Sequence, residues 1–323
     1  MILLVGDIHA TPEELGDCEK LIDLICETLD SHGDIAAVTF LGDQYNTFNV
    51  VRTEVMDFWI RSFDRIRNHK NSPHVIALVG NHDYAGEGLK IHSMSAHQDA
   101  ITVIDRYDIW NSDKILVLPY MSDKDEFIRM CRENSEMTTV VCHQSFNGGT
   151  YENGMYIPDG IDPLEIPQDR IISGHIHMPQ SFGKVTYIGA PRWRSIKDAN
   201  TERHLWSLSA YGVLAPLVST GTHCRQIRFH LDTPNDPISL PLDDSVDWRI
   251  DIRGPSDWIE KRRGLLAGKG VRLRTFKEDA IVAKVKESEG VDLAFYKYVG
   301  CFKPRYGTSM EVLKTMVTDR IKV

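Results

Sequence analysis

Short apolar runs, each followed by polar residues, recur along the first 180 residues of the chain. Continuous runs of four to six residues rich in Val, Ile and Leu are typical of strands buried on both faces. Each of these runs ends in a segment that contains Asp, Asn or His. The predicted strands cover residues 2–5, 36–41, 75–79, 138–142 and 170–173.

Helical patterns separate the first three of these strands. Thr11 and Glu14 have the spacing of a capping box, Pro12 suits the first helical position, and Gly33 can end the helix. A second helix is expected from about residue 50 to 67. Its apolar side comprises Val55, Phe58, Trp59, Phe63 and Ile66. This alternation predicts a layered α/β core of β-sheets flanked by helices.

The pattern changes after about residue 230. Residues 232–241 are rich in Pro and turn-forming residues, as expected for a domain boundary. We therefore predict a main domain over residues 1–235 and a small C-terminal α+β domain over residues 242–323. Within the latter, strands are expected at 246–253, 270–276 and 292–299, helices at 255–267 and 278–288, and a final helix with Met310, Leu313, Val317 and Ile321 on one face.

The composition is that of a soluble globular protein, with 42% hydrophobic and 26% charged residues. No apolar run approaches the roughly 18 residues needed to span a bilayer, and the N-terminus lacks the basic segment of a signal peptide. The six cysteines form no CxxC pair. These features favour a cytoplasmic protein with reduced thiols and no membrane association.

Charge is distributed unevenly along the chain. The formal net charge is −9, of which residues 1–241 carry −13 and residues 242–323 carry +4. Carboxylates gathered at a metal site contribute to a negative balance only while that site is empty. An acidic solvated surface would give the same balance, so charge alone leaves both interpretations open.

The polar ends of the predicted strands carry the candidate chemistry. Open α/β sheets bind ligands beyond the carboxyl ends of their strands, so these loops are expected to converge. Carboxylate, amide and imidazole groups without a thiolate suit Mn²⁺, Fe²⁺ or Zn²⁺. Seven candidate ligands are too many for one ion, and two ions bridged by a carboxylate suit in-line attack on phosphorus. The motifs are Asp7-x-His9, Gly42-Asp43, Gly80-Asn81-His82-Asp83, His143 and Gly174-His175-x-His177.

The order of these motifs resembles that of the calcineurin-like metallophosphoesterase superfamily, over residues 1 to about 200. The resemblance implies two sets of ligands that share Asp43 as a bridge, and it favours Mn²⁺, with Fe²⁺, Zn²⁺ or Mg²⁺ as alternatives. It also implies that His82 stays free of metal and protonates the leaving oxygen, oriented by Asp83. The implied sets are Asp7, His9, Asp43 and His177 for one ion, and Asp43, Asn81, His143 and His175 for the other.

Within the superfamily the chain resembles the SbcD-type catalytic subunits of double-strand-break repair nucleases, particularly the compact phage recombination enzymes. The shared features are Gly80-Asn81-His82-Asp83, the Thr-Tyr-Ile-Gly-Ala-Pro segment at 186–191, and a C-terminal domain like the DNA-capping domain. This resemblance implies Mn²⁺-dependent exonuclease and endonuclease activity on DNA and an SbcC-type ATPase partner, and it leaves a homodimer open. Gln44-Tyr45-Asn46 departs from the family pattern, so substrate contacts there cannot be transferred.

Basic residues in two places are candidate DNA contacts. Arg192 and Arg194 flank Trp193, and two guanidinium groups beside an indole can contact phosphates and stack on a base. A buried Trp between two solvated arginines explains the same residues equally well. The second group is Lys261, Arg262 and Arg263, for which a solvated surface is the simpler explanation.

Three classes of function are compatible with these features. The leading hypothesis is a two-metal phosphodiesterase that acts on DNA, followed by a phosphatase or a phosphodiesterase for small nucleotides. The third is a non-enzymatic protein that retains the fold, against which the complete ligand set argues. Salt separates the first two, because DNA binding weakens steeply as salt rises.

Overall fold

The computed structural model describes residues 1–86, 91–110, 114–210, 212–236, 240 and 242–278. The chain divides into two compact units: Met1–Phe229 with Leu242–Arg249, and His230–Pro241 with Ile250–Val323. Residues 242–249 fall in the first unit in this division. The strand predicted at 292–299, the final helix and all but the first residue of the helix at 278–288 lie outside the described residues.

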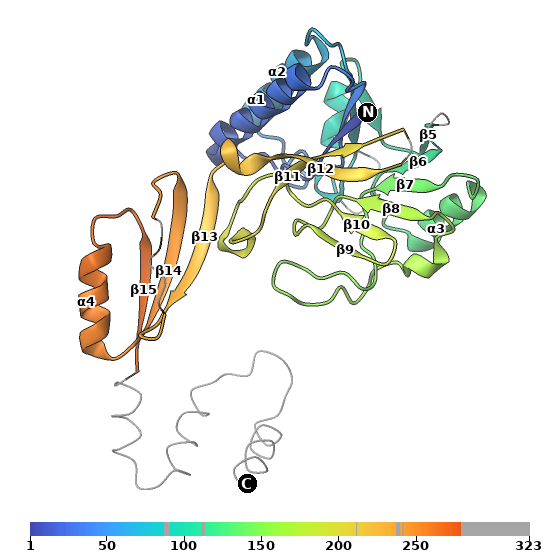
Figure 1. Ribbon diagram of the computed structural model, residues 1–323. Coiled ribbons are helices and arrows are strands. Elements are labelled where there is room, and N and C mark those ends of the chain that lie inside the picture. The colour runs from blue at the N-terminus through green and yellow to red at the C-terminus, as the bar shows by residue number, and fades with distance from the viewer. Residues whose placement is uncertain (87–90, 111–113, 211, 237–239, 241, 279–323) are drawn as a thin grey trace, which may run out of the picture. The chain divides into compact units, whose positions relative to one another are not determined.

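The first unit is built on two six-stranded sheets (Figure 1). In spatial order, the first sheet contains β12 (Leu214–Ser219), β11 (His204–Leu208), β1 (Ile2–Val5), β2 (Ala37–Phe40), β3 (His74–Leu78) and β4 (Thr102–Ile104). The second contains β5 (Asp108–Trp110), β6 (Ile115–Leu118), β7 (Thr139–Cys142), β8 (Arg170–Ser173), β10 (Val185–Tyr187) and β9 (Gln180–Phe182). All five predicted strands are confirmed, as β1, β2, β3, β7 and β8.

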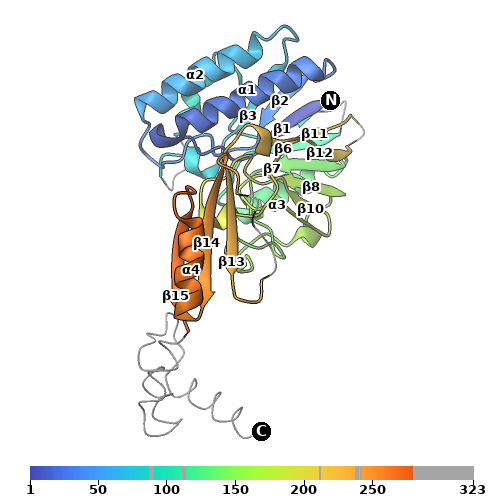
Figure 2. The same ribbon diagram turned by 60° about the vertical axis from the view of Figure 1, so that its left-hand side comes forward.

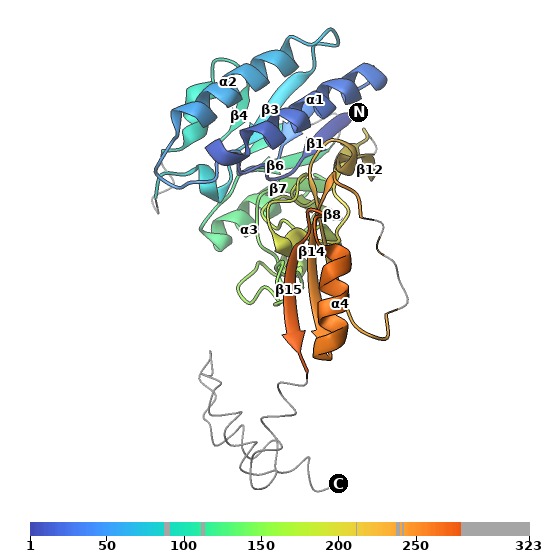
Figure 3. The same ribbon diagram turned by 90° about the vertical axis from the view of Figure 1, so that its left-hand side faces the viewer.

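Helices cover the outer faces of these sheets. The helices α1 (Leu15–Ser31) and α2 (Thr53–Arg67) lie side by side over the first sheet in all three views (Figure 1, Figure 2 and Figure 3), and α3 (Lys124–Glu133) packs on the second sheet. The five apolar residues predicted for the second helix are all buried.

Side chains alternate between these layers along each strand. In β1, Leu3 and Val5 belong to the core beneath α1 and α2, whereas Leu4 belongs to a separate core shared by the two sheets. This alternation is the period-two pattern that a strand covered on both faces requires. The layered α/β fold predicted from the sequence is confirmed.

The capping box predicted at Thr11 is not formed. Pro12–Glu14 make a short 3-10 turn, α1 begins at Leu15, and the Thr11 side chain caps no backbone N–H. The Glu14 carboxylate instead accepts a hydrogen bond from Nη2 of Arg192 at 2.8 Å. An ion pair to a buried guanidinium has replaced the local cap, which sequence spacing alone could not show.

A smaller sheet contains β13 (Gln226–Asp232), β14 (Val246–Gly254) and β15 (Arg272–Lys277), and α4 (Ser256–Leu266) follows β14. In the second unit, Ile250, Ile252 and Ile259 are fully buried. The strands predicted at 246–253 and 270–276 and the helix predicted at 255–267 are confirmed within two residues at each end.

Two further expectations concern the thiols and the membrane. The five cysteines among the described residues are unpaired and buried, and Cys301 lies outside that part of the chain. None of the helices that the structure describes has the length and apolar character required to cross a bilayer.

Candidate metal centre

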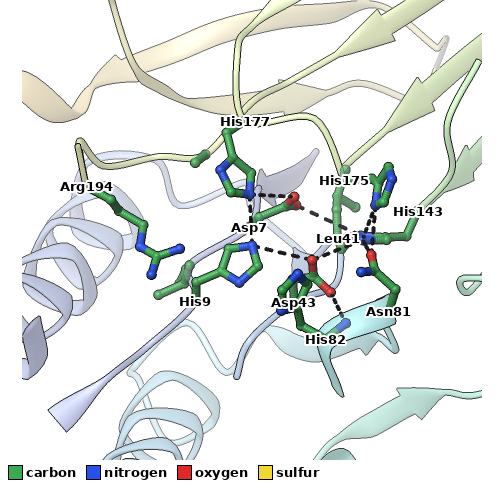
Figure 4. A network of polar contacts seen from close by, with 12 residues as sticks. Asp7, His9, Leu41, Asp43, Asn81, His82, His143, His175, His177 and Arg194 are labelled. Atoms are coloured by element: carbon green, nitrogen blue, oxygen red, sulfur yellow. Dashed lines mark hydrogen bonds and ion pairs between the residues drawn. The ribbon is translucent and has the colours of Figure 1, made fainter. Parts of the chain in front are cut away.

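The loops that follow β1, β2, β3, β7 and β8 meet at one place in the first unit (Figure 4). All seven residues predicted as metal ligands lie there. Asp7, His9 and His177 form one group whose ligand atoms lie within 4.8 Å of one another. Asp43, His143 and His175 form a second group within the same limit, and Asn81 joins it.

Asp43 lies between the two groups. Its Oδ2 is 3.4 Å from Nε2 of His9 and 3.3 Å from Nε2 of His143. One carboxylate oxygen therefore faces a histidine of each predicted set, the arrangement required of a bridging ligand.

Asn81 completes the second group. Its Oδ1 lies 2.8 Å from Nδ1 of His175 and 3.1 Å from Nε2 of His143. The other nitrogen of His143, Nδ1, donates to the carbonyl of Leu41 at 2.6 Å. This contact leaves Nε2 of His143 as the nitrogen available to a metal, as is usual for ligating histidines.

The buried polar atoms of the first group fit a cation. Both carboxylate oxygens of Asp7 are buried, and within the described part of the chain neither has a hydrogen-bond partner. The Nε2 atoms of His9 and His177 face each other at 2.9 Å. A buried carboxylate without a hydrogen-bond partner is costly, and a divalent ion would supply positive charge and ligand bonds to it.

The backbone at the centre is unusual. His9, Asp43 and His175 have positive φ angles of 47°, 55° and 74°. Such angles are uncommon for residues with a Cβ, and they cluster at functional sites where the surrounding structure enforces them.

Two motif glycines are explained by close approach. Gly42 has φ of 108°, and a Cβ there would lie 2.2 Å from Nδ1 of His143. A Cβ on Gly174 would lie 2.6 Å from Oδ1 of Asp7. Any side chain at either position would displace a predicted ligand.

Charges in the centre are poorly balanced without a cation. Burial raises the pKa of Asp7 to about 8, and the Asp43 carboxylate adds to this effect. Burial would also raise the pKa of Asp43, but His143 and His9 outweigh it and hold that pKa below its usual range. Burial opposes a charge on His143, yet Asp43 and Asp7 raise its pKa to about 9. Asp7 and His143 therefore bind protons that must leave before these residues can bind metal ions.

We expect the stabilisation by metal to grow between pH 6.5 and 9. Without metal, folded Asp7 and His143 bind more protons in this range than the unfolded chain, whose pKa values are 3.8 and 6.5. The free energy of unfolding of the metal-free protein therefore falls as pH rises through this range. Metal affinity rises over the same range because fewer protons must be displaced.

Thermal unfolding in a chelator and in excess Mn²⁺ at pH 6.5 and 8.5 measures both effects. The difference in Tm between chelator and metal should be larger at pH 8.5. A difference that shrinks with pH would contradict the proton occupancy described here.

His82 lies beside the centre, close to His9. Its ring centroid is 4.6 Å from that of His9, and its ligand atom groups with those of His9 and Asp43. The Nδ1 of His82 lies 2.9 Å from the Asn46 carbonyl oxygen, to which it donates when protonated. The Nε2 atom is then left to hold or release a proton.

Asp83 has a structural role that differs from the predicted one. Its buried carboxylate accepts hydrogen bonds from the backbone N–H groups of Gly80, Asp43 and Tyr45, at 2.9, 2.9 and 3.0 Å. The prediction that Asp83 orients the His82 ring is therefore wrong, because the Asn46 carbonyl makes that contact. Burial and the nearby Asp43 raise the pKa of Asp83 to about 7.

Replacing Asp83 by Ala should lower the free energy of unfolding by about 2–4 kcal/mol. The change leaves three buried N–H groups without their acceptor, each worth roughly 1–3 kcal/mol, while the cost of burying the carboxylate is recovered. Urea denaturation of the metal-free protein measures the loss. Asp83→Asn, which keeps an acceptor oxygen, is the matched control and should lose less; equal losses would assign the effect to charge.

In the Pro191-Arg192-Trp193-Arg194 segment the first three residues are buried and Arg194 is partly exposed. Arg192 is 1% exposed and donates to the carbonyls of Ile8 and His9, at 3.0 and 2.9 Å. Trp193 is 4% exposed and donates to the Thr201 carbonyl. The prediction that these two residues contact DNA is wrong; Arg192 instead fastens the loop that carries His9.

Arg194 retains access to the centre. Its side chain is 21% exposed, Nη2 donates to Oδ1 of Asn46 at 2.9 Å, and Nε lies 3.4 Å from Glu14. Figure 4 shows it on the side of His9 and His177. Burial lowers the pKa values of His9 and His177, and the charge of Arg194 contributes in the same direction. Both imidazoles are thereby kept neutral, the form that binds metal.

The basic residues of α4 also divide. Lys261 and Arg263 are exposed, and Arg263 pairs with Glu260. Arg262 forms an ion pair with Asp232, whose side chain is buried. Arg262 therefore has a structural partner within the second unit, and its role as a DNA contact stays a prediction.

Two residues at the centre, Asn46 and Glu152, could not be predicted from the sequence. Asn46 holds His82 through its carbonyl and Arg194 through its side chain. Glu152 places Oε1 3.5 Å from Nδ1 of His177. The only signal for Asn46 was its place in the segment that departs from the family pattern, and nothing in the sequence singled out Glu152.

A family model described as calcineurin-like phosphoesterase matches residues 1–179, which is more than half of the chain. The matched residues include all seven predicted ligands and His82. A search of curated proteins finds no match to this sequence.

Proposed function

We propose that this chain, which belongs to the calcineurin-like phosphoesterase family of metal-dependent phosphoester hydrolases, acts on DNA. The reaction is hydrolysis of a phosphodiester bond at the two-metal centre. Mn²⁺ is the proposed metal, and a nuclease of recombination and repair that works with an SbcC-type ATPase is the proposed context. The resemblance of the motifs to those of SbcD-type nucleases supports these finer assignments.

The residues of the centre divide the work of hydrolysis. The two groups of ligands around Asp43 would hold two divalent ions, which would supply positive charge to the phosphoryl oxygens and make bound water more nucleophilic. Asp43 holds the two ligand sets together. As the bond from phosphorus to the 3′-oxygen breaks, Nε2 of His82 gives its proton to that oxygen. The Asn46 carbonyl accepts from Nδ1 and keeps the ring oriented during the transfer.

An exposed aromatic ring beside His82 is the observation that best supports a nucleic acid substrate. Phe48 is 48% exposed and stacks on the His82 ring, with centroids 4.2 Å apart and planes 29° from parallel. Phe48 and Tyr45 also line a groove of about 420 Å³. A base of the leaving strand can stack on such a surface, whereas a small phosphomonoester has no base to stack there.

The charge of Arg194 supports an anionic substrate on the same side. A guanidinium next to His9 and His177 repels the metal ions that those histidines are placed to bind. The Glu14 carboxylate, 3.4 Å from Nε, offsets part of this charge, and an anion between Arg194 and the ions would be attracted by both. A phosphate oxygen fits, because guanidinium groups bind phosphate through paired hydrogen bonds.

A comparison of substrates tests the proposed function. Metal-stripped protein, with and without Mn²⁺, is incubated with duplex DNA, single-stranded DNA and p-nitrophenyl phosphate. Metal-dependent DNA cleavage with slow hydrolysis of the monoester is expected. Faster hydrolysis of the monoester would favour a phosphatase, and bound metal without turnover on any substrate would favour a non-enzymatic protein.

Lys261 and Arg263 test whether the second unit contributes to DNA binding. Changing both to Glu should lower the affinity for duplex DNA, and each lost phosphate contact should flatten the log–log salt dependence by roughly 0.9. Arg262 is left unchanged because it pairs with buried Asp232. Fluorescence anisotropy at several salt concentrations gives the slope, and an unchanged slope would mean that these residues are solvated surface.

A further inference from the structure

A second cavity of the first unit, of about 550 Å³, adjoins the metal centre. Its walls come from Asp105–Tyr107 after β4, from the segment after β6 and from α3. Tyr120 belongs to this lining, and its ring is nearly parallel to that of His175, with centroids 6.0 Å apart. One tyrosine ring therefore separates the cavity from a predicted metal ligand.

The lining of this cavity suits a flat aromatic ligand. Tyr84, Tyr107 and Tyr120 contribute three aromatic rings, and Met121 adds a polarisable apolar surface. Tyr107 is 56% exposed, so its ring is open to a ligand. The volume lies within the range of pockets that hold ligands of nucleoside size.

The charges of the lining disfavour a phosphate. Four carboxylates contribute to it, against two arginines. Arg129 is committed to Glu126 and Glu133, at 2.5 and 2.7 Å. Of the remaining carboxylates, Asp123 accepts from the backbone N–H of Glu126 through Oδ1, and Asp105 lies 3.4 Å from Nε2 of His92 through Oδ2. Each keeps a second oxygen that can accept from an N–H group at the edge of a nucleobase.

The two sides of Asp43 differ in the surfaces they offer. On one side lie His82, which protonates the leaving oxygen, and the stacked Phe48. On the other lie His143, His175 and the cavity behind Tyr120. Consider a phosphodiester that lies at the metal centre with its leaving group toward His82. Its other ester group, which stays on the phosphorus, would then point away from Phe48.

We propose that this cavity binds the base of the nucleotide whose 5′-phosphate is attacked, while the leaving strand follows Phe48. The proposal rests on the proposed function and adds a base-binding pocket on the non-leaving side. Cleavage would then release a 5′-mononucleotide whose base had occupied the cavity.

Two diesters with the same leaving group test the pocket. Thymidine 5′-(p-nitrophenyl phosphate) has a base on the non-leaving side, and methyl p-nitrophenyl phosphate has none. Tyr107→Ala should reduce kcat/KM for the thymidine ester about tenfold, mainly through KM, because a stacking surface is lost. Ser122→Trp, which adds bulk to the cavity wall, should act in the same direction. Neither variant should affect the methyl ester.

Tyr156→Ala is the matched control, because Tyr156 is 75% exposed and does not line the cavity. It should leave both substrates unchanged. Equal losses on both esters, or no loss on either, with Tyr107→Ala and Ser122→Trp would overturn the pocket.

Failure of the proposed function would look different, because the wild-type protein would then leave DNA uncleaved. In that case saturation-transfer NMR with thymidine tests directly whether the cavity binds a nucleoside. Transfer that is present with wild-type protein and lost with Tyr107→Ala supports the pocket, and no transfer with wild-type protein overturns it.

Discussion

Replacing His82 by Ala should slow cleavage of DNA by about 10²–10⁴-fold, the usual contribution of a general acid. A 3′-oxygen leaves as a poor alkoxide and needs the proton from Nε2. A nitrophenolate needs little protonation, so bis-p-nitrophenyl phosphate should be hydrolysed far closer to the wild-type rate. Metal content should stay at two ions per chain, because Asn81 supplies the ligand from this loop.

His175→Ala is the matched control for this experiment. His175 belongs to the Asp43 and His143 group, so its loss should remove metal and both activities together. The proximity of His82 to His9 and Asp43 makes the alternative concrete. Equal losses on both substrates with His82→Ala, accompanied by lost metal, would identify His82 as a ligand and refute the acid mechanism.

Asp43→Asn should reduce metal content below two ions per chain and abolish turnover. The amide oxygen can replace Oδ1 as acceptor of the His82 backbone N–H, which is 2.8 Å away. The NH₂ group then takes the place of Oδ2, between His9 and His143, and presents hydrogens where a bridging oxygen is required.

Elemental analysis after dialysis measures the metal content, and circular dichroism reports whether the variant is folded. Asp23→Asn, a change on the exposed surface of α1, controls for the loss of one carboxylate and should retain two ions. If Asp43→Asn retains two ions, the assignment of Asp43 as the bridging ligand is wrong.

The convergence of the predicted ligands could be expected from the sequence because it follows a rule about strands. Asp7, Asp43 and His175 each follow a buried apolar run, and the carboxyl ends of such strands lie at one edge of a layered fold. Local sequence was therefore enough to predict that these residues meet, as the structure shows. The same reasoning predicted α2, whose apolar positions follow the helical period.

Contacts between distant segments could not be predicted in this way. The partner of His82 is a backbone carbonyl, which every residue has, so the side chain of Asn46 gave no indication of it. Arg192 and Arg194 are two residues apart, yet one is buried under the His9 loop and the other reaches the centre. Glu14 matched a capping box locally but pairs with Arg192 across 178 residues.

Arg192 donates hydrogen bonds to the loop that contains His9, and this contact limits how short an active fragment of the protein can be. A chain cut at residue 179 would keep all seven predicted metal ligands, yet it would lose the guanidinium that binds the carbonyls of Ile8 and His9. It would also lose β11, the antiparallel neighbour of β1, so that β1 would become an exposed edge strand. The smallest autonomous form of the centre must therefore extend beyond β11, and truncations intended for assay or crystallisation should preserve that segment.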